Sequence, residues 1–304
     1  MYHYLEQHPD IYLPPIKETN HFAAADIDHA HFLPTYARDV DIDLDAYIRS
    51  GMKRQVHIAH VDDPAHYAAL FTRVKGEKAV GEISNSYMIC PSAAGAIHAY
   101  APDAKIIVVL RNPVRRAWSQ YLMNLREAKS DDIAFKDELL RDHHAERKGW
   151  GVNHQYLQLG CYADQLKAYI DLFGKQNVLP IFFEPYRSDP QKVMREICTF
   201  LGVDSDFAFD FSVESNKASM PRNKTLNKLL VSSGLLNGVK NLTPKPIRKH
   251  FAKVLYSENK IPKLSAADRE WLQEWYRAEV KKLADLLGDE VYTHWPEFKT
   301  TIPA

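Results

Sequence analysis

The 304-residue sequence is poor in cysteine: it contains only Cys90, Cys161 and Cys198, and no two of them form a CxxC pair. Three widely separated cysteines favour buried thiols in a reducing compartment. No apolar run approaches the length of a membrane span, and residues 1–10 are too polar for a cleavable signal sequence. We therefore expect a cytoplasmic protein without a transmembrane segment.

The chain also has no excess of either charge, because 39 Lys and Arg residues balance 39 Asp and Glu residues. It contains neither a GxxxxGK[ST] phosphate loop nor a Mg²⁺-binding carboxylate motif after a strand, which disfavours a P-loop kinase. We expect no nucleic-acid partner. Apolar residues make up 45% of the sequence, enough for a sizeable core, and no break in composition divides it. The sequence predicts one domain, 1–304.

One segment departs from this charge balance. Residues 217–263 contain eleven Lys or Arg residues against one acidic residue, Glu258. Such an asymmetry indicates an anionic partner at one face. A sulfated or carboxylated glycan, an anionic membrane surface and a merely solvated basic face all fit this pattern.

The clearest local pattern is a strand followed by a helix. Residues 106–110 form a continuous apolar run that is mostly β-branched, as a parallel strand covered on both faces requires. Asn112 is a good N-cap and Pro113 a good first helical residue, so a helix should run from 113 to about 127. A second strand at 178–183 precedes a helix at 189–201 closed by Gly202. The alternation predicts an α/β fold, with a central parallel sheet flanked by helices.

Two side chains of this unit form a candidate anion site. Arg111 stands at the carboxyl end of the strand, the edge where open α/β sheets bind ligands. Ser119 lies six residues beyond Pro113, about 9 Å along the helix. Arg111 and the Ser119 hydroxyl could therefore meet at one phosphate. An ordinary surface pair fits the same spacing.

Three stretches resemble the sulfotransferases that use 3′-phosphoadenosine 5′-phosphosulfate (PAPS). Residues 111–121 match R-N-P-x-x-R-A-x-S-x-Y, the 3′-phosphate-binding segment of that family. Residues 2–22 match Y-x-x-L-x-x-H-P-x-I-x-x-P-x-x-K-E-x-x-x-F, and residues 156–166 match Y-x-x-x-G-x-Y-x-x-Q-L. The resemblance implies a P-loop nucleotide-kinase-like sulfotransferase fold, with PAPS as sulfuryl donor and no metal.

The resemblance also assigns roles to individual residues. It makes Arg111 and Ser119 the ligands of the nucleotide 3′-phosphate and Glu18 the general base. Arg222, in the stretch N-K-A-S-M-P-R, becomes a third cofactor ligand. Taken alone, Glu18 follows Pro14 and Pro15, so we expect a loop, and a solvated loop carboxylate is the alternative interpretation.

The sequence departs from the family at several points. A strand and a loop of the form G-x-x-K-x-G-T-T-S, which surrounds the 5′-phosphosulfate in the family, are absent from these 304 residues, so we expect an N-terminally truncated version of the fold. Residues 81–87 resemble the family's G-E-K-S-P-x-Y element, but Ile83 replaces the Lys that can stabilise charge on the transferred group. Asn20 stands where glycosaminoglycan-type members of the family have a His. His21 stands where an aromatic residue is usual.

The leading hypothesis is a sulfotransferase that moves a sulfuryl group from PAPS to a hydroxyl or amine of a carbohydrate-type acceptor. The alternative is a degenerate member of the fold that binds nucleotide or polyanion without turnover. His29, His31, His57 and His60 have spacings that could serve a metal. With no Cys or carboxylate constellation evident beside them, we interpret them as a solvated His-rich region.

Overall fold

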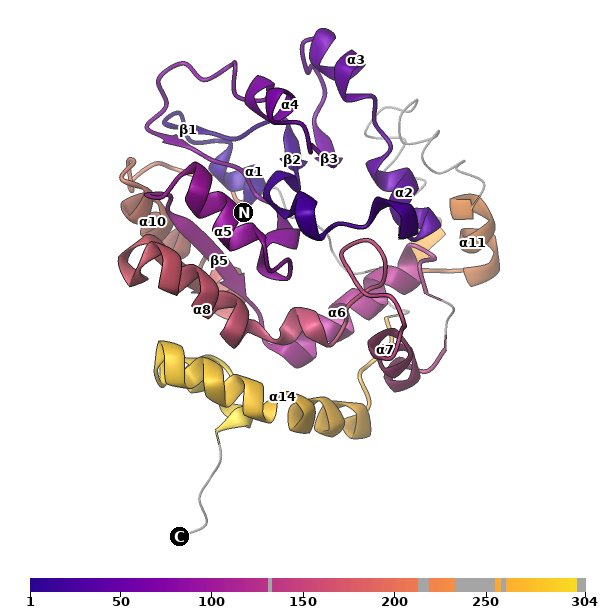
Figure 1. Ribbon diagram of the computed structural model, residues 1–304. Helices are drawn as coiled ribbons and strands as arrows, with labels where there is room; N and C mark the ends of the chain where they lie inside the picture. Colours follow the sequence, from indigo (N-terminus) through magenta and orange to yellow (C-terminus); the bar gives the residue numbers. More distant parts are fainter. Residues whose placement is uncertain (131–132, 213–218, 233–254, 258–260, 300–304) are drawn as a thin grey trace.

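The computed structural model describes residues 1–130, 133–212, 219–232, 255–257 and 261–299, and its chain path is drawn in Figure 1. Short strands and helices are interspersed along the described residues. The strands are β1 (Ile11–Tyr12), β2 (Ile16–Glu18), β3 (Val56–Ile58), β4 (Ala79–Val80), β5 (Ile106–Leu110), β6 (Val178–Phe182), β7 (Met220–Pro221) and β8 (Tyr256–Ser257). The helices of the first half are α1 (Tyr2–Leu5), α2 (Pro34–Val40), α3 (Leu44–Arg49), α4 (Pro64–Ala69), α5 (Ala93–Tyr100), α6 (Pro113–Arg126) and α7 (Phe135–His143). The later helices are α8 (Tyr162–Phe173), α9 (Phe183–Ser188), α10 (Pro190–Leu201), α11 (Lys224–Ser232), α14 (Ala266–Leu287) and α15 (Glu290–His294).

Strands β5 and β6 form the centre of the fold. They pair in parallel, with Ile106 opposite Val178 and Leu110 opposite Phe182. Because successive side chains of a strand point to opposite faces, the pair has two apolar faces. Val108, Leu110, Val178 and Phe182 belong to one hydrophobic cluster. Ile107, Leu179 and Ile181 belong to another.

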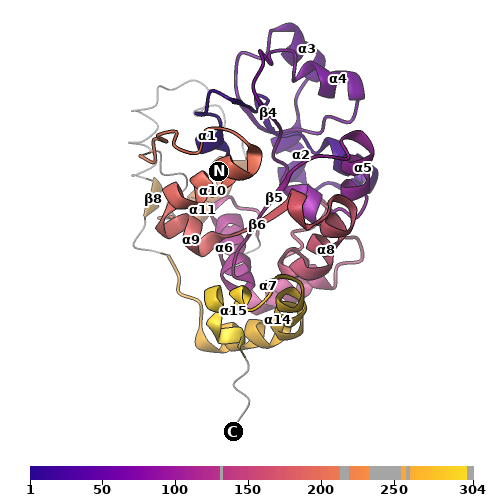
Figure 2. The same cartoon turned by 90° about the vertical axis from the view of Figure 1, so that its left-hand side faces the viewer.

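Helices cover both faces of this pair. In Figure 2, α5 and α8 lie on one side of β5 and β6, and α9 and α10 lie on the other. The first cluster takes buried residues from α5, α6, α8 and α14, and the second takes Val193, Met194, Ile197 and Cys198 from α10. Helix α10 ends at Gly202, which has φ +79° in the left-handed region that suits glycine.

A second parallel pair, β2 and β3, lies with α3 and α4 in the upper part of Figure 1. Ile16 pairs with Val56 and Glu18 pairs with Ile58. Ile16, Tyr67 and Leu70 are buried together in a separate cluster beneath this pair. The expected loop at Lys17 and Glu18 is wrong, because these residues belong to β2. Pro14 and Pro15 precede the strand and so cost it no hydrogen bond.

The α/β class and the parallel pairing predicted from the sequence are confirmed. Within the described residues, the strands are hydrogen-bonded in pairs (β1 with β4, β2 with β3, β5 with β6, and antiparallel β7 with β8) rather than in one continuous sheet. Among the described helices, none combines the length and apolarity needed to cross a bilayer. Much of the basic segment 217–263, namely residues 217–218, 233–254 and 258–260, lies outside the described residues.

Candidate active site

Glu18 is a buried carboxylate, with only 3% of its surface exposed. It ends β2, and its backbone carbonyl accepts a hydrogen bond from the Ala59 amide (2.9 Å). Its Oε1 atom accepts hydrogen bonds from Lys17 Nζ (3.2 Å) and Asn85 Nδ2 (3.1 Å). His57 Nε2 lies 3.9 Å from the same oxygen. The alternative interpretation of Glu18 as a solvated carboxylate is therefore wrong, since neighbouring strands and the turn at Asn85 enclose it.

A second carboxylate, Glu82, lies beside this strand end. Its Oε2 atom accepts a hydrogen bond from the Ser84 hydroxyl (2.8 Å), and its Oε1 atom accepts one from the Tyr87 hydroxyl. The Ser84 oxygen in turn accepts hydrogen bonds from the backbone amides of Thr19 (3.0 Å) and Asn20 (3.1 Å). Glu82 thus orients Ser84, and Ser84 fixes the backbone immediately after Glu18.

Burial dominates the electrostatics of Glu82. It raises the pKa of this carboxyl from its ordinary value of 4.5 to about 7, against the opposing effect of the hydrogen bonds from Tyr87 and Ser84. A carboxyl with this pKa exchanges its proton near neutral pH. The candidate site therefore contains two neighbouring carboxyl groups with different surroundings, which is a frequent feature of active sites.

Asn20 locks the turn that follows Glu18. Its φ of 54° lies in the left-handed region, which asparagine tolerates better than most residues. The fully buried side chain donates from Nδ2 to the Ala59 carbonyl (2.9 Å) and accepts from the Ser86 hydroxyl (2.6 Å). The next residue, His21, stacks on Tyr67 with ring centroids 4.0 Å apart. His21 thus performs the packing expected of an aromatic residue at this position.

Arg111 follows β5 directly, at the carboxyl end of the central pair. Its guanidinium carbon lies 4.8 Å from the centre of the Phe183 ring, a cation–π contact. Its Nε atom is buried and has no hydrogen-bond partner among the described residues. Burial lowers the pKa of this guanidinium, which still stays protonated as arginine does in proteins. A half-buried, oriented cation with an unused buried donor atom is suited to an anionic ligand.

Ser119 is half-buried on α6, the helix that begins after Arg111. Asn112 caps this helix by accepting a hydrogen bond from the Arg115 amide (3.1 Å), as the sequence predicted. The buried Asn112 also donates from Nδ2 to Glu297 Oε1 (2.7 Å). Near it, Glu184 Oε2 accepts a hydrogen bond from Trp295 Nε1 (3.2 Å). The C-terminal region therefore braces the junction of β5 and α6.

Helix α8 connects the two parts of the site. At its first residue, the Tyr162 hydroxyl donates to the Arg111 carbonyl (2.9 Å). Two turns later, the Tyr169 hydroxyl donates to the Tyr87 carbonyl (2.7 Å), beside the Glu82 network. Seven helical residues span about 10 Å. Both parts are therefore anchored to one rigid helix, although no direct hydrogen bond or ion pair joins Glu18 to Arg111 or Ser119 among the described residues.

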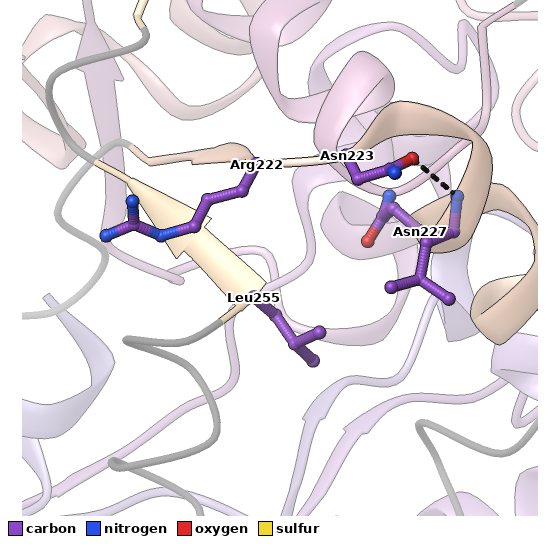
Figure 3. A pocket seen from close by; sticks show the side chains of 5 residues that line it. Arg222, Asn223, Asn227 and Leu255 are labelled. Atoms are coloured by element: carbon purple, nitrogen blue, oxygen red, sulfur yellow. Dashed lines mark hydrogen bonds between the residues drawn. The ribbon is translucent and has the colours of Figure 1, made fainter.

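Arg222 follows β7, which packs against α6. Its backbone amide donates to the Leu255 carbonyl (2.8 Å), and its side chain extends beside β8, away from Asn227 (Figure 3). A pocket of about 110 Å³ is lined by Arg222, Asn223, Leu226, Asn227 and Leu255. This volume is well below the roughly 300–1,000 Å³ of ordinary ligand pockets. The role of Arg222 as a cofactor ligand stays a prediction.

The sequence model of the family described as "Sulfotransferase domain" matches residues 90–287. This chain belongs to that family. The matched part of the sulfotransferase domain includes Arg111, Ser119 and Arg222, whereas Glu18 precedes it.

Individual relatives agree with this assignment. The chain is 32% identical over 142 residues to a human heparan sulfate glucosamine 3-O-sulfotransferase 6, covering 46% of this chain and 40% of that protein. It is 25% identical over 216 residues to a bifunctional heparan sulfate N-deacetylase/N-sulfotransferase 1 from Caenorhabditis briggsae, covering 69% of this chain and 24% of that protein. The chain thus spans less than half the length of either relative. A crystal structure of a sulfotransferase from Alicyclobacillus acidocaldarius superposes with a TM-score of 0.65 at 29% identity, over 94% of this chain and 89% of that one.

The structure adds residues to the site that sequence reasoning missed. The stretch from Gly81 to Tyr87 resembles a family element, but its Glu82 was assigned no role. Its neighbours Ser84 and Tyr87 could have indicated a hydrogen-bonded carboxylate. Ile83, in contrast, is an apolar residue packed against the second hydrophobic cluster, as its side chain predicts.

Proposed function

We propose that this sulfotransferase domain transfers a sulfuryl group from PAPS to a hydroxyl or amine of a carbohydrate-type acceptor, with Glu18 as general base. The observation that carries the proposal is the buried Glu18 carboxylate, held at the end of β2 by Lys17 and Asn85. The acceptor class is supported by the heparan sulfate sulfotransferases among the relatives.

In the proposed reaction, Glu18 removes a proton from the acceptor oxygen or nitrogen as that atom attacks the sulfur of PAPS. A bond forms between the acceptor atom and sulfur, and the bond from sulfur to the bridging 5′-phosphate oxygen breaks. 3′-Phosphoadenosine 5′-phosphate leaves with the bonding electron pair. Glu18 can hold the proton because its carboxylate has a second oxygen, Oε2, that is not engaged by Lys17 or Asn85.

Arg111 and Ser119 form the nucleotide end of the proposed site. The half-buried Arg111 cation would bind the 3′-phosphate, with the Ser119 hydroxyl as a further donor. The Tyr162 and Tyr169 hydroxyls of helix α8 hold the carbonyls of Arg111, at the nucleotide end, and of Tyr87, beside the carboxylates. In the proposed complex, the 3′-phosphate binds at Arg111 and the 5′ group faces the carboxylates.

Glu18→Gln tests the chemical part of the proposal. The variant keeps the shape of the side chain but cannot accept the proton, so we expect sulfuryl transfer to fall by about 10²–10⁴-fold. Transfer from labelled PAPS to desulfated heparan oligosaccharides would be measured by mass spectrometry. The exposed Glu146 provides a matched control, and Glu146→Gln should leave the rate unchanged. An unchanged rate in Glu18→Gln would remove Glu18 from the mechanism.

A second candidate is nucleotide or polyanion binding without turnover. The observation that favours it is Ile83, an aliphatic residue where the resemblance expects a lysine that stabilises charge. This candidate predicts binding of 3′-phosphoadenosine 5′-phosphate by calorimetry, with no sulfated product from any tested glycan. Ile83→Lys would distinguish the two, since only an otherwise assembled active site can gain rate from the added cation.

A further inference from the structure

The structure brings His29 together with His60 and Asp62, which lie more than 30 positions later in the sequence. One ligand atom of each of His29, His60 and Asp62 lies within 4.8 Å of the ligand atoms of the other two. His29 comes from the short 3₁₀ helix η2 (His29–His31), and the other two residues follow β3. The sequence suggested histidines without a carboxylate partner; Asp62 supplies that carboxylate.

The backbone after β3 explains why His60 and Asp62 share one face. Ala59 donates its amide to the Glu18 carbonyl (2.9 Å) and Val61 donates to the Thr19 carbonyl (3.0 Å), so the chain stays extended here. Side chains alternate in such a segment. Ala59 and Val61 are fully buried, which turns His60 and Asp62 outward together.

Helix η2 brings the third residue to this face. Phe32, just after η2, stacks on the His60 ring with centroids 5.1 Å apart, and the His29 ring meets the same histidine at 4.9 Å. His29 Nε2 lies 3.2 Å from Asp62 Oδ2. Ligands of a tetrahedral Zn²⁺ ion, each about 2.0–2.1 Å from the metal, are separated by about 3.3 Å. The His29–Asp62 pair already has this spacing, and both side chains are exposed enough to rotate toward His60.

His60 is prepared to act as a ligand. Its Nε2 atom lies 3.1 Å from the Tyr36 hydroxyl, whereas its Nδ1 atom is buried without a hydrogen-bond partner among the described residues. A second partner on the opposite ring nitrogen is the usual way in which proteins orient a metal-binding histidine.

We propose that His29, His60 and Asp62 form a binding site for a divalent transition metal of the Zn²⁺ type. Two imidazoles and one carboxylate suit Zn²⁺, and three protein ligands leave a fourth position for water. The ion would clamp η2 to the extended segment that is hydrogen-bonded to Glu18 and Thr19. This site is separate from the candidate active site and does not depend on the proposed function.

Calorimetric titration of the tag-free, metal-free 304-residue chain with ZnCl₂ tests the site. We expect one saturable site, weakened at least tenfold by His60→Ala and by Asp62→Asn. His31→Ala is the matched control, because His31 lies on the same helix, is exposed and pairs with Asp28 Oδ2 (2.6 Å). Its Zn²⁺ affinity should stay within twofold of the unmodified chain. The absence of saturable binding, or equal weakening by His31→Ala, would overturn the proposal.

A spectroscopic measurement keeps the test independent of folding defects. Co²⁺ in a four-coordinate site has strong visible absorption bands, which are weak for an ion bound loosely to a surface. We expect these bands in the unmodified chain and their loss in His29→Ala, whose exposed side chain can be removed without a cavity. Co²⁺ spectra that are unchanged by His29→Ala would also overturn the proposal.

Discussion

Replacing Arg111 with alanine should weaken binding of 3′-phosphoadenosine 5′-phosphate more than binding of adenosine 5′-phosphate, which has no 3′-phosphate. The reason lies in how the side chain is held. Its guanidinium lies over Phe183 at 4.8 Å, its Nε atom is buried and unpaired among the described residues, and Tyr162 anchors its backbone carbonyl. A cation fixed in this way loses little freedom when an anion binds.

The size of the effect follows from the contact that is lost. A hydrogen bond to a charged group contributes about 1.5–3 kcal/mol, which corresponds to a ten- to a hundredfold loss of affinity. Arg111→Lys should give an intermediate loss, because lysine keeps the charge but not the planar fork. Phe183→Leu removes only the cation–π contact, worth about 0.5–1 kcal/mol, and should cost two- to fivefold.

Isothermal titration of both nucleotides against each variant measures these differences. Arg277→Ala serves as the control, because Arg277 is an exposed residue of α14 that pairs with Glu274 (2.8 Å) and lies outside the candidate site. It should bind both nucleotides as the unmodified chain does. Equal losses for the two nucleotides in Arg111→Ala would refute the assignment of Arg111 to the 3′-phosphate.

Two further predictions concern stability. Because the folded-state pKa of Glu82 is raised from 4.5 to about 7, the folded chain holds an extra proton between these values, and its free energy of unfolding should fall as the pH rises through this window. At 1.36 kcal/mol per pH unit the loss of unfolding free energy is at most about 3 kcal/mol, and it is about 1–2 kcal/mol for a half-buried group. Urea denaturation at several pH values measures this loss, which should be absent in Glu82→Gln. An identical pH profile in that variant would contradict the assignment to Glu82. Gly160→Ala should destabilise by about 1–3 kcal/mol, since its new Cβ would lie 2.7 Å from the hydroxyl of the buried Tyr276. Gly95→Ala, in α5 with open space around it, should instead be neutral or stabilise by up to about 1 kcal/mol, and similar values for both glycines would contradict the packing argument.

The central unit could be predicted from the sequence because its signals are local. The apolar run 106–110, the Asn112 cap and Pro113 are contiguous, and the observed β5 and α6 follow them closely. The sequence also indicated the end of α10 at Gly202, for the same reason. Such features need no information about distant parts of the chain.

The surroundings of Glu18 could not be predicted in this way. β2 has three residues, too few for a periodic pattern, and its existence depends on pairing with Val56–Ile58. Asn85, which donates a hydrogen bond to Glu18, lies 67 positions later, and the cluster of His29 with Asp62 joins residues that are 33 positions apart. These contacts arise only when the chain folds, so residue types alone could suggest Glu18 but could not show its environment.

The contact between Asn112 and Glu297 also has a consequence for protein synthesis. The two residues are 185 positions apart, and Trp295 makes the neighbouring contact with Glu184. A nascent chain therefore cannot complete the junction of β5 and α6 until residue 297 has left the ribosome. A product ending before Trp295 would leave the buried Asn112 amide without its carboxylate acceptor, at a cost of about 1–3 kcal/mol. Completion of the β5–α6 junction is in this way delayed until this late segment of the chain has been synthesised.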